Sequence, residues 1–130
     1  MNKVYLKTHF QSNLGQSDLP ESFSIITAYA TTGETWTEQE NINANAKLKA
    51  KLISLGVLVG EIDGYDPDTG HCEAGFIAQL NWQEACVIGL EFKQDAIYFI
   101  SGGELFVTYC DNQRKLIQVG NFFERLKNKK

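Results

Sequence analysis

From residue 22 onward the chain alternates between two hydrophobic patterns, and their order limits the folds that it can adopt. Runs rich in β-branched and aromatic residues predict strands, whereas apolar residues spaced three and four apart predict helices. The predicted order is strand, helix, strand, strand, helix, strand, strand. The strands are 22–30, 57–63, 71–80, 95–101 and 104–110, and the helices are 38–55 and 82–93. The first six elements match the split βαβ order of ferredoxin-like folds.

We therefore expect an α+β fold, a two-layer sandwich in which a mainly antiparallel sheet carries both helices on one face. The ferredoxin-like order is extended by extra strands, which we place at residues 3–10 and 114–120. The length of 130 residues predicts a single domain, 1–130. The last residues, about 126–130, are mostly basic and are expected to be a frayed tail after a short helix.

Local signals mark the ends of the two main helices. Thr37 with Glu40, and Asn81 with Glu84, have the spacing of a capping box, in which two orphan backbone donors find side-chain acceptors. Gly56 follows the first helix as a C-terminal glycine. These signals set the predicted ends of the two helices.

Two glycine positions predict how the elements pack and turn. Gly89 lies on the expected core face of the second helix, where it lowers helix propensity but lets helix and sheet approach closely. Gly102 and Gly103 separate two apolar runs and predict a tight hairpin.

The composition bounds the classes of function. A net charge of −4 argues against broad binding of nucleic acid or of an anionic membrane. The first ten residues lack the apolar region of a secretory signal, and no run approaches the roughly 20 apolar residues that cross a bilayer. Three unpaired cysteines, Cys72, Cys86 and Cys110, suit a reducing compartment. We expect a soluble, cytoplasmic protein without nucleic-acid or membrane partners.

The first helix carries an unusual apolar stripe. Leu48, Leu52 and Leu55 follow helical spacing, but the same stripe extended toward the N-terminus reaches Asn45 and Asn41. A buried amide without partners costs roughly 1–3 kcal/mol, so both side chains need partners. Three alternatives are open. The amides cap backbone groups of residues 30–36, they border a polar pocket, or they are exposed in a splayed first turn.

Short motifs spread along the chain resemble a bacterial family known only as domain of unknown function 3293. The resemblance spans roughly residues 3–108. The matching residues are Phe23, Ile26, Thr27, Ala28, Tyr29, Glu40, Asn41, Asn45, Leu48, Glu73, Phe76, Phe92, Gln94, Ala96 and Ile97. It implies a bacterial origin and supplies no activity.

The chain departs from that family at four places. Ala30-Thr31 replaces Asn-Pro, Ala44 replaces Arg, Gly75 replaces Ser, and Lys93 replaces Gly. Any chemistry carried by the missing polar groups is in doubt here.

The pocket alternative gives a specific site hypothesis. Thr27, Glu73 and Gln94 would converge with Asn41 and Asn45 near the N-terminus of the first helix and form a ligand-binding site for a small polar molecule. If the protein is an enzyme, Glu73 is the candidate acid or base. We expect a non-enzymatic interaction or small-ligand-binding module, and the alternative is an enzyme that acts on a small polar substrate.

Other chemistry has little support in the sequence. The acidic stretch 63–73 lacks the ligand order of an EF-hand, and alternation puts His71 and Cys72 on opposite faces of a strand, so we expect no metal. No cofactor motif occurs, and none of the cysteines lies in a nucleophile motif. We expect no cofactor.

The expected partners are an unknown protein or a small polar ligand. Apolar residues of the Gly102-Gly103 hairpin and of Phe122 and Phe123 lie near a predicted sheet edge. They predict a weak homodimer, unless the C-terminal segment covers that edge within one chain.

Overall fold

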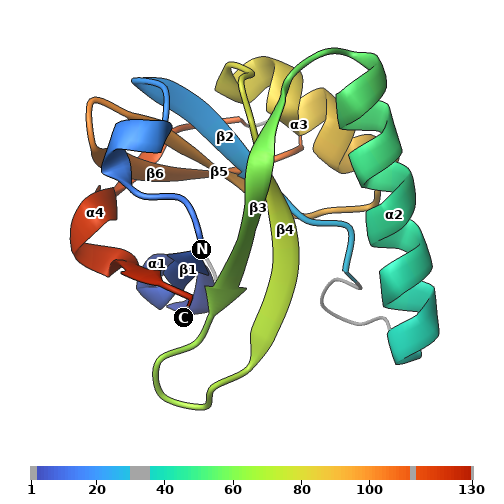
Figure 1. Ribbon diagram of the computed structural model, residues 1–130, viewed down its shortest axis with the longest axis horizontal. Helices are drawn as coiled ribbons and strands as arrows, with labels where there is room; N and C mark the ends of the chain where they lie inside the picture. Colours follow the sequence, from blue (N-terminus) through green and yellow to red (C-terminus); the bar gives the residue numbers. More distant parts are fainter. Residues whose placement is uncertain (1–2, 30–35, 112–113, 130) are drawn as a thin grey trace.

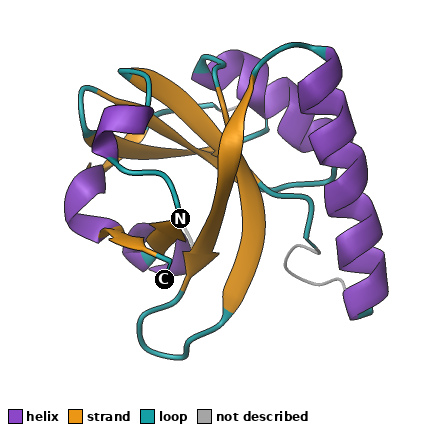
Figure 2. Cartoon of the chain, in the orientation of Figure 1, coloured by secondary structure: helices purple, strands orange, loops and turns teal. Residues whose placement is uncertain are grey.

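A computed structural model describes residues 3–29, 36–111 and 114–129 of the chain. The described elements run along the chain in the order α1 (Lys3–Lys7), β1 (His9–Ser12), a 3₁₀ turn (Gln16–Asp18), β2 (Ser22–Ile26), α2 (Glu38–Ser54), β3 (Leu58–Tyr65), β4 (Cys72–Ala78), α3 (Trp82–Glu91), β5 (Ala96–Ser101), β6 (Glu104–Tyr109), β7 (Ile117–Asn121), α4 (Phe122–Arg125) and β8 (Leu126–Asn128). Figure 2 shows this mixed α+β content at a glance.

The described strands form one eight-stranded sheet in the order β7-β6-β5-β2-β4-β3-β1-β8. Neighbouring strands are antiparallel except for β1 and β8, which are parallel, with Phe10 opposite Leu126. The sheet curls, so that its two ends approach each other around α1 and α4 while α2 and α3 lie on the outer face (Figure 1).

The outer face of the sheet carries the core that both long helices bury. Leu48 and Leu52 of α2, and Ile88 of α3, pack with Ile26 and Phe76 of the sheet. Gly89 makes this packing possible, because a Cβ there would lie 2.9 Å from Cys110 Sγ. The predicted close approach of helix and sheet at Gly89 is therefore confirmed.

The inner, concave face of the sheet carries a second core. A two-layer sandwich with both helices on one face would have no core on its other face. Phe10, Phe23, Ile77 and Phe122 are fully buried there. Phe122 comes from α4, so the C-terminal segment closes this face. Successive residues of one strand pack in different cores: Ile25 belongs to the inner core and Ile26 to the outer core.

Several predicted boundaries are confirmed. Thr37 and Asn81 cap α2 and α3, each in a capping box with the glutamate three residues on. Gly56 has a φ of 72° just after α2, and Gly102 and Gly103 turn between β5 and β6 with φ of 56° and 81°. These features depend on neighbouring residues only, which is why the sequence reveals them.

The prediction of a strand over residues 3–10 is wrong at its start. Residues 3–7 form α1, and the strand begins at His9. Distant contacts hold this short helix: Arg125 Nη1 donates to the carbonyls of Leu6 at 2.9 Å and Thr8 at 3.2 Å. A five-residue helix gains little from its own hydrogen bonds, so its stability depends on such contacts.

The expected frayed tail is also wrong over the described residues 126–128. They form β8, and the Lys129 N–H donates to Ser12 O at 3.0 Å. The reason is that β1 offers an open edge, whose backbone groups need partners. Among the described residues, no helix combines the length and the apolar character needed to cross a membrane.

Candidate functional site

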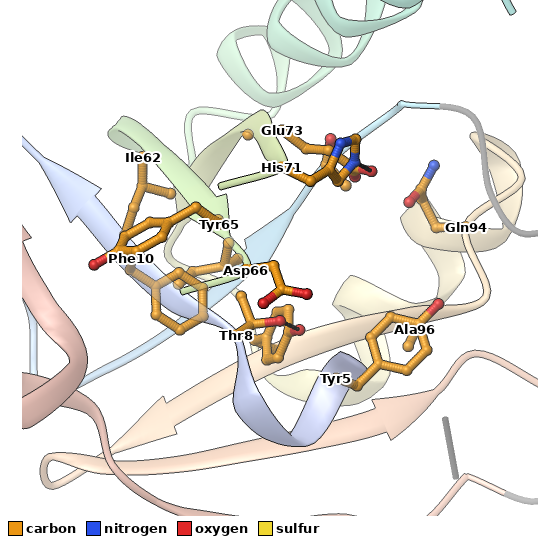
Figure 3. Close-up of a pocket in the computed structure, with 15 residues that line it drawn as sticks. Tyr5, Thr8, Phe10, Ile62, Tyr65, Asp66, His71, Glu73, Gln94 and Ala96 are labelled. Carbon is orange, nitrogen blue, oxygen red and sulfur yellow. Dashed lines mark hydrogen bonds and ion pairs between the residues drawn. The ribbon is translucent and has the colours of Figure 1, made fainter. Parts of the chain in front are cut away.

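A cavity of about 290 Å³ opens on the concave face of the sheet, between α1 and the strands β2 to β5. Figure 3 shows its labelled side chains arranged around one space. The described lining residues are Tyr5, Thr8, Phe10, Ile25, Thr27, Ile62, Gly64, Tyr65, Asp66, His71, Glu73, Gly75, Gln94, Ala96 and Tyr98. The cavity has aromatic walls with a few polar groups among them, as small-molecule sites have.

The alternation of side chains along the strands explains how the lining assembles. Ile25 and Thr27 are two residues apart at the end of β2, and Glu73 and Gly75 are two residues apart in β4. Residues spaced by two point to the same face of a sheet, so all four face the concave side. Gly75 leaves room for β2, because a Cβ there would lie 2.9 Å from Ile26 O.

Gln94 is placed by the turn that ends α3. The Lys93 N–H donates to Leu90 O at 3.1 Å, and the Gln94 N–H donates to Gly89 O at 2.8 Å. This pair of bonds is a Schellman motif, whose C′ residue adopts the left-handed conformation. That residue is Lys93, with a φ of 60°. The turn directs the Gln94 side chain from the end of the helix into the cavity (Figure 3).

The amide of Gln94 is held on one side only. Its Nε2 donates to Tyr29 O at 2.7 Å and to Phe92 O at 3.3 Å, and the residue is buried. No described residue bonds its Oε1, which faces the cavity in Figure 3. The amide nitrogen is therefore used by the fold, and the oxygen is left for a ligand or water.

Ion pairs and carbonyl contacts hold α1 over the cavity. Lys7 Nζ lies 3.0 Å from Asp68 Oδ2 and 3.6 Å from Asp66 Oδ2, which links α1 to the loop between β3 and β4. Arg125 holds the other side of α1 through the Leu6 and Thr8 carbonyls. The hydrogen bond from Lys7 to Asp68 raises the pKa of the lysine, so the ammonium stays charged.

Tyrosine rings form much of the wall. The rings of Tyr5 and Tyr98 pack edge to face with centroids 6.5 Å apart, and Tyr98 packs in the same way on Phe10 at 5.2 Å. The Tyr98 hydroxyl donates to Thr8 Oγ1 at 2.8 Å. Burial raises the pKa of both phenols, that of Tyr5 to about 12, so both stay protonated at neutral pH.

Two carboxylates and one histidine complete the polar lining. Asp66 accepts from the Asp68 N–H at 2.8 Å, and this backbone hydrogen bond is the largest cause that lowers the pKa of the carboxyl. Glu73 Oε2 lies 3.0 Å from His71 Nε2. The histidine side chain is 70% exposed and the glutamate side chain 33%, so the pair stands at the cavity mouth.

Asn45 has a different place from the one that the pocket hypothesis gave it. It faces inward, as its helical spacing predicted, and is buried. The Ala28 N–H donates to its Oδ1 at 3.1 Å, and its Nδ2 donates to Ala74 O at 3.1 Å. Thr27 Oγ1 donates to the same Ala74 carbonyl at 2.8 Å. The amide joins the ends of β2 and β4 on the outer face of the sheet.

The structure brings together three of the five residues of the predicted site. Thr27, Glu73 and Gln94 line the cavity, whereas Asn41 and Asn45 are outside its described lining. The partners of Asn45, residues 28 and 74, also differ from the capping alternative, which named residues 30–36. Asn41 is half-buried in the first turn of α2, and most of that loop lies outside the described residues. The ligand-binding role itself stays a prediction.

Sequence reasoning missed the residues that complete the cavity. Tyr5 lies in α1, where a strand was predicted, and Asp66 and His71 lie in the acidic stretch 63–73, where neither residue was predicted to be part of a site. One signal was available, since His71 and Glu73 are two residues apart and so share a face at the start of β4. No local pattern places Tyr5 above them.

Other candidate chemistry finds no support in the described residues. Cys86 and Cys110 are buried and Cys72 is exposed, and all three are free thiols. Within the described part of the chain, no three His, Cys, Asp or Glu side chains are grouped so that they could hold a metal ion.

A second hollow, of about 390 Å³, lies between the start of α2 and the end of α3 and is more open than the first. Its described lining is Trp36, Glu40, Asn43, Ala44, Lys47, Glu91, Phe92 and Lys93. Most of these residues are charged or polar and exposed, so the concave-face cavity is the better candidate for a built site.

The comparisons with known proteins identify a family without an assigned activity. Residues 26–97, more than half of the chain, match the family described as "Protein of unknown function (DUF3293)". The chain therefore belongs to this family, as its motifs indicated. No curated protein and no solved structure matches the chain significantly.

The matched segment contains only part of the cavity. It includes Thr27, Glu73 and Gln94, whereas Tyr5 and Tyr98 lie outside it. Most of the aromatic wall is thus built by parts of the chain on either side of the matched segment, and Tyr65 lies within it.

Proposed function

We propose that this protein is a small-ligand-binding module and that its site is the cavity on the concave face of the sheet. The observation that carries the proposal is the Gln94 amide, buried at the cavity wall with its oxygen facing the space. A buried amide oxygen that no described residue bonds costs free energy unless something in the cavity bonds to it. Thr27 and Glu73 line the same cavity as Gln94, so the three polar side chains border one space.

The dimensions favour a small molecule over a protein segment. A space of about 290 Å³ lies near the lower end of ligand pockets, which span roughly 300–1,000 Å³. The cavity is covered by α1, which Lys7 and Arg125 hold in place. An extended peptide would need a long groove, whereas a compact molecule fits a partly open cavity of this size.

A thermal-shift screen of polar metabolites tests the proposal. A ligand at tenfold excess over its Kd stabilises the folded chain by about 1.4 kcal/mol, which raises the melting temperature by about 5 °C in a domain of this size. Ala96→Leu places a larger side chain at the cavity wall and should abolish the shift. Ala50→Leu adds the same side chain on the exposed face of α2 and should keep it.

Two outcomes of this screen and its variants would contradict the proposal. Circular dichroism must first show that Ala96→Leu is folded. A screen without hits would contradict the proposal, and so would a hit whose shift survives in folded Ala96→Leu.

A second candidate function is catalysis on a small polar substrate, with Glu73 as acid or base. The contact between Glu73 Oε2 and His71 Nε2 at the cavity mouth favours it, because paired titratable groups at a pocket are a common catalytic arrangement. Incubation of the protein with a mixed metabolite extract, followed by mass spectrometry, tests it. Turnover lost in Glu73→Gln would support the enzyme, and binding without turnover would support the module.

We further propose that the central elements form a ferredoxin-like unit in two layers. The support is the order β5-β2-β4-β3 at the centre of the sheet, with α2 and α3 on one face. We also propose a bacterial, cytoplasmic protein, in keeping with its three free thiols. An acidic net charge supports the absence of nucleic-acid and membrane partners.

A weak homodimer through the sheet edge stays a proposal with less support. Phe122, which motivated it, is fully buried, and Phe123 packs over Gly103 within the same chain. Light scattering at micromolar concentration tests it, and a monomer mass throughout would reject it.

A further inference from the structure

Three side chains of the lining, Gln94, Asp66 and Glu73, offer hydrogen-bond acceptors to the cavity. Gln94 uses its amide hydrogens on the carbonyls of Tyr29 and Phe92, so only its oxygen is available. Asp66 and Glu73 contribute carboxylates. Thr27 donates its hydroxyl hydrogen to Ala74 O and its Oγ1 accepts from the Tyr29 N–H at 3.3 Å, so it has no hydrogen left to donate to a ligand. Such a cavity favours a ligand that donates.

The Gln94 oxygen is an independent sign of a ligand. The residue is 7% exposed, and no described residue bonds its Oε1. In the described part of the chain, no fully buried side-chain nitrogen or oxygen lacks a partner. The oxygen must therefore be reached from the cavity, where a ligand atom can meet it.

The charge of the lining is mainly negative. The described lining contains two carboxylates, no lysine or arginine, and one histidine, His71, whose Nε2 lies 3.0 Å from Glu73 Oε2. Lys7 is the nearest cation in the ion-pair network, and its shorter contact is with Asp68 outside the cavity, at 3.0 Å against 3.6 Å to Asp66. The Asp66 side chain is only 11% exposed. The Asp68 N–H and Lys7 stabilise its charge, which favours the ionised carboxylate at the cavity wall.

Tyr5 contributes a partly buried phenol to the cavity wall. Burial is the largest cause that raises its pKa to about 12, followed by the charge of Asp95 outside the cavity lining, with a smaller effect from Glu73. In Figure 3 the Tyr5 ring borders the same space as the Asp66 and Glu73 carboxylates. An aromatic face next to carboxylates is the setting in which proteins bind organic cations.

We propose that the cavity binds an organic cation, a primary ammonium or guanidinium group on a small apolar body. The cationic N–H groups donate to Gln94 Oε1 and to the Glu73 carboxylate, and Asp66 adds its charge. The apolar body packs on the Tyr5 and Phe10 side of the cavity. This inference rests on the proposed function, because it names the ligand class of the same site.

A series of three probes of matched size and shape tests the charge preference. Isothermal titration of the whole chain at neutral pH would use 2-phenylethylamine as cation, 2-phenylethanol as neutral molecule and phenylacetate as anion. We expect the amine to bind at least about tenfold more tightly than the alcohol, because hydrogen bonds between charged groups are the stronger ones. We expect phenylacetate to bind most weakly of the three.

Three variants locate the site. Gln94→Leu removes the acceptor oxygen and Glu73→Gln removes the charge, and each should weaken amine binding about tenfold or more. Glu61→Gln is the matched control, because Glu61 is an exposed carboxylate of β3 outside the cavity lining. It removes the same net charge and should leave the amine affinity within about twofold, since exposed charges are screened.

The outcomes separate this inference from the proposed function. Equal binding of amine and alcohol, or a preference for phenylacetate, would overturn the inferred preference for a cation. It would leave the proposal of a binding cavity intact. An equal loss in Glu61→Gln would also overturn it. If none of the probes binds but the metabolite screen gives a cavity-dependent hit, only the ligand class fails. If both give nothing, both proposals fail. The wild-type preference decides even if a variant does not fold.

Discussion

At the scale of single residues, Asn45 shows how an amide on an apolar stripe is used. Its two hydrogen bonds, to the Ala28 N–H and the Ala74 carbonyl, join the ends of two neighbouring strands from one helix position. The position therefore serves the scaffold that carries Thr27 and Glu73, rather than the cavity wall.

Asn45→Leu should destabilise the fold by roughly 1–3 kcal/mol, because the Ala28 N–H loses its acceptor while remaining buried. Urea unfolding measures the change. Asn43→Leu is the control two positions earlier, on the exposed face of α2, and should change stability by less than about 0.5 kcal/mol. A neutral or stabilising Asn45→Leu would show that the two bonds contribute nothing.

Tyr5 gives a prediction about alkaline pH. The folded chain holds its phenolic proton more tightly than the unfolded chain, since burial raises the pKa to about 12. The contribution to stability is therefore complete below the unfolded pKa of about 10 and is lost as the pH rises through about 12. Urea unfolding across that window should show a smaller decline in Tyr5→Phe than in wild type. Parallel declines would contradict the buried environment of the phenol.

At the scale of elements, the two long helices end in the same motif with different residues. After α2 the left-handed position is Gly56, with a φ of 72°, and after α3 it is Lys93, with a φ of 60°. A side chain in this conformation is unfavourable by roughly 1–2 kcal/mol. Lys93 therefore destabilises, by this conformational strain, the turn that positions Gln94.

Lys93→Gly should stabilise the fold by about 0.5–1 kcal/mol, the relief of strain less the greater entropy of an unfolded glycine. Lys47→Gly, in the exposed interior of α2, should cost about 1 kcal/mol instead. Thermal and urea unfolding would measure both. Destabilisation by Lys93→Gly would mean that the lysine side chain contributes more than the strain removes.

How much the sequence predicts follows from the range of the interactions. The capping boxes at Thr37 and Asn81, and the turns at Gly56 and Gly102-Gly103, involve neighbouring residues and were predicted correctly. The helical wheel also gave the inward direction of Asn45. It could not show what stands opposite, because the partners of that amide belong to β2 and β4. The direction of a side chain is local information, whereas its surroundings are not.

The cavity was predictable only in part for the same reason. Thr27, Glu73 and Gln94 were named from motifs, but α1 was assigned to a strand and Tyr5 had no assigned role. The contact that fixes α1 joins Arg125 to Leu6, 119 residues apart in the chain. No pattern within a short window contains such a contact.

At the scale of the whole molecule, the two ends of the chain close the concave face. The family segment, residues 26–97, provides the carboxylates, the histidine and Gln94 of the cavity, and the N-terminal and C-terminal segments add α1, β1, α4 and β8. Phe122 holds these parts together, with ring centroids 5.3 Å from Phe10 and 5.5 Å from Phe23.

Phe122→Ala should therefore destabilise the fold by about 3–5 kcal/mol, because a fully buried ring leaves a cavity behind it. Phe123→Ala, a half-buried neighbour, should cost less than half as much. Chemical denaturation of both variants provides the comparison. Similar, small losses would mean that the C-terminal segment is not part of the cooperative core.

The claim that the concave-face cavity is the binding site is tested most directly by mapping a bound ligand onto the chain. Backbone ¹H–¹⁵N spectra would be recorded while the strongest screening hit is titrated into uniformly labelled protein. We predict the largest shift changes at Thr27, Glu73 and Gln94, with changes in the side-chain amide signals of Gln94. Changes concentrated instead at Lys47 and Lys93, beside the second hollow, would contradict the account.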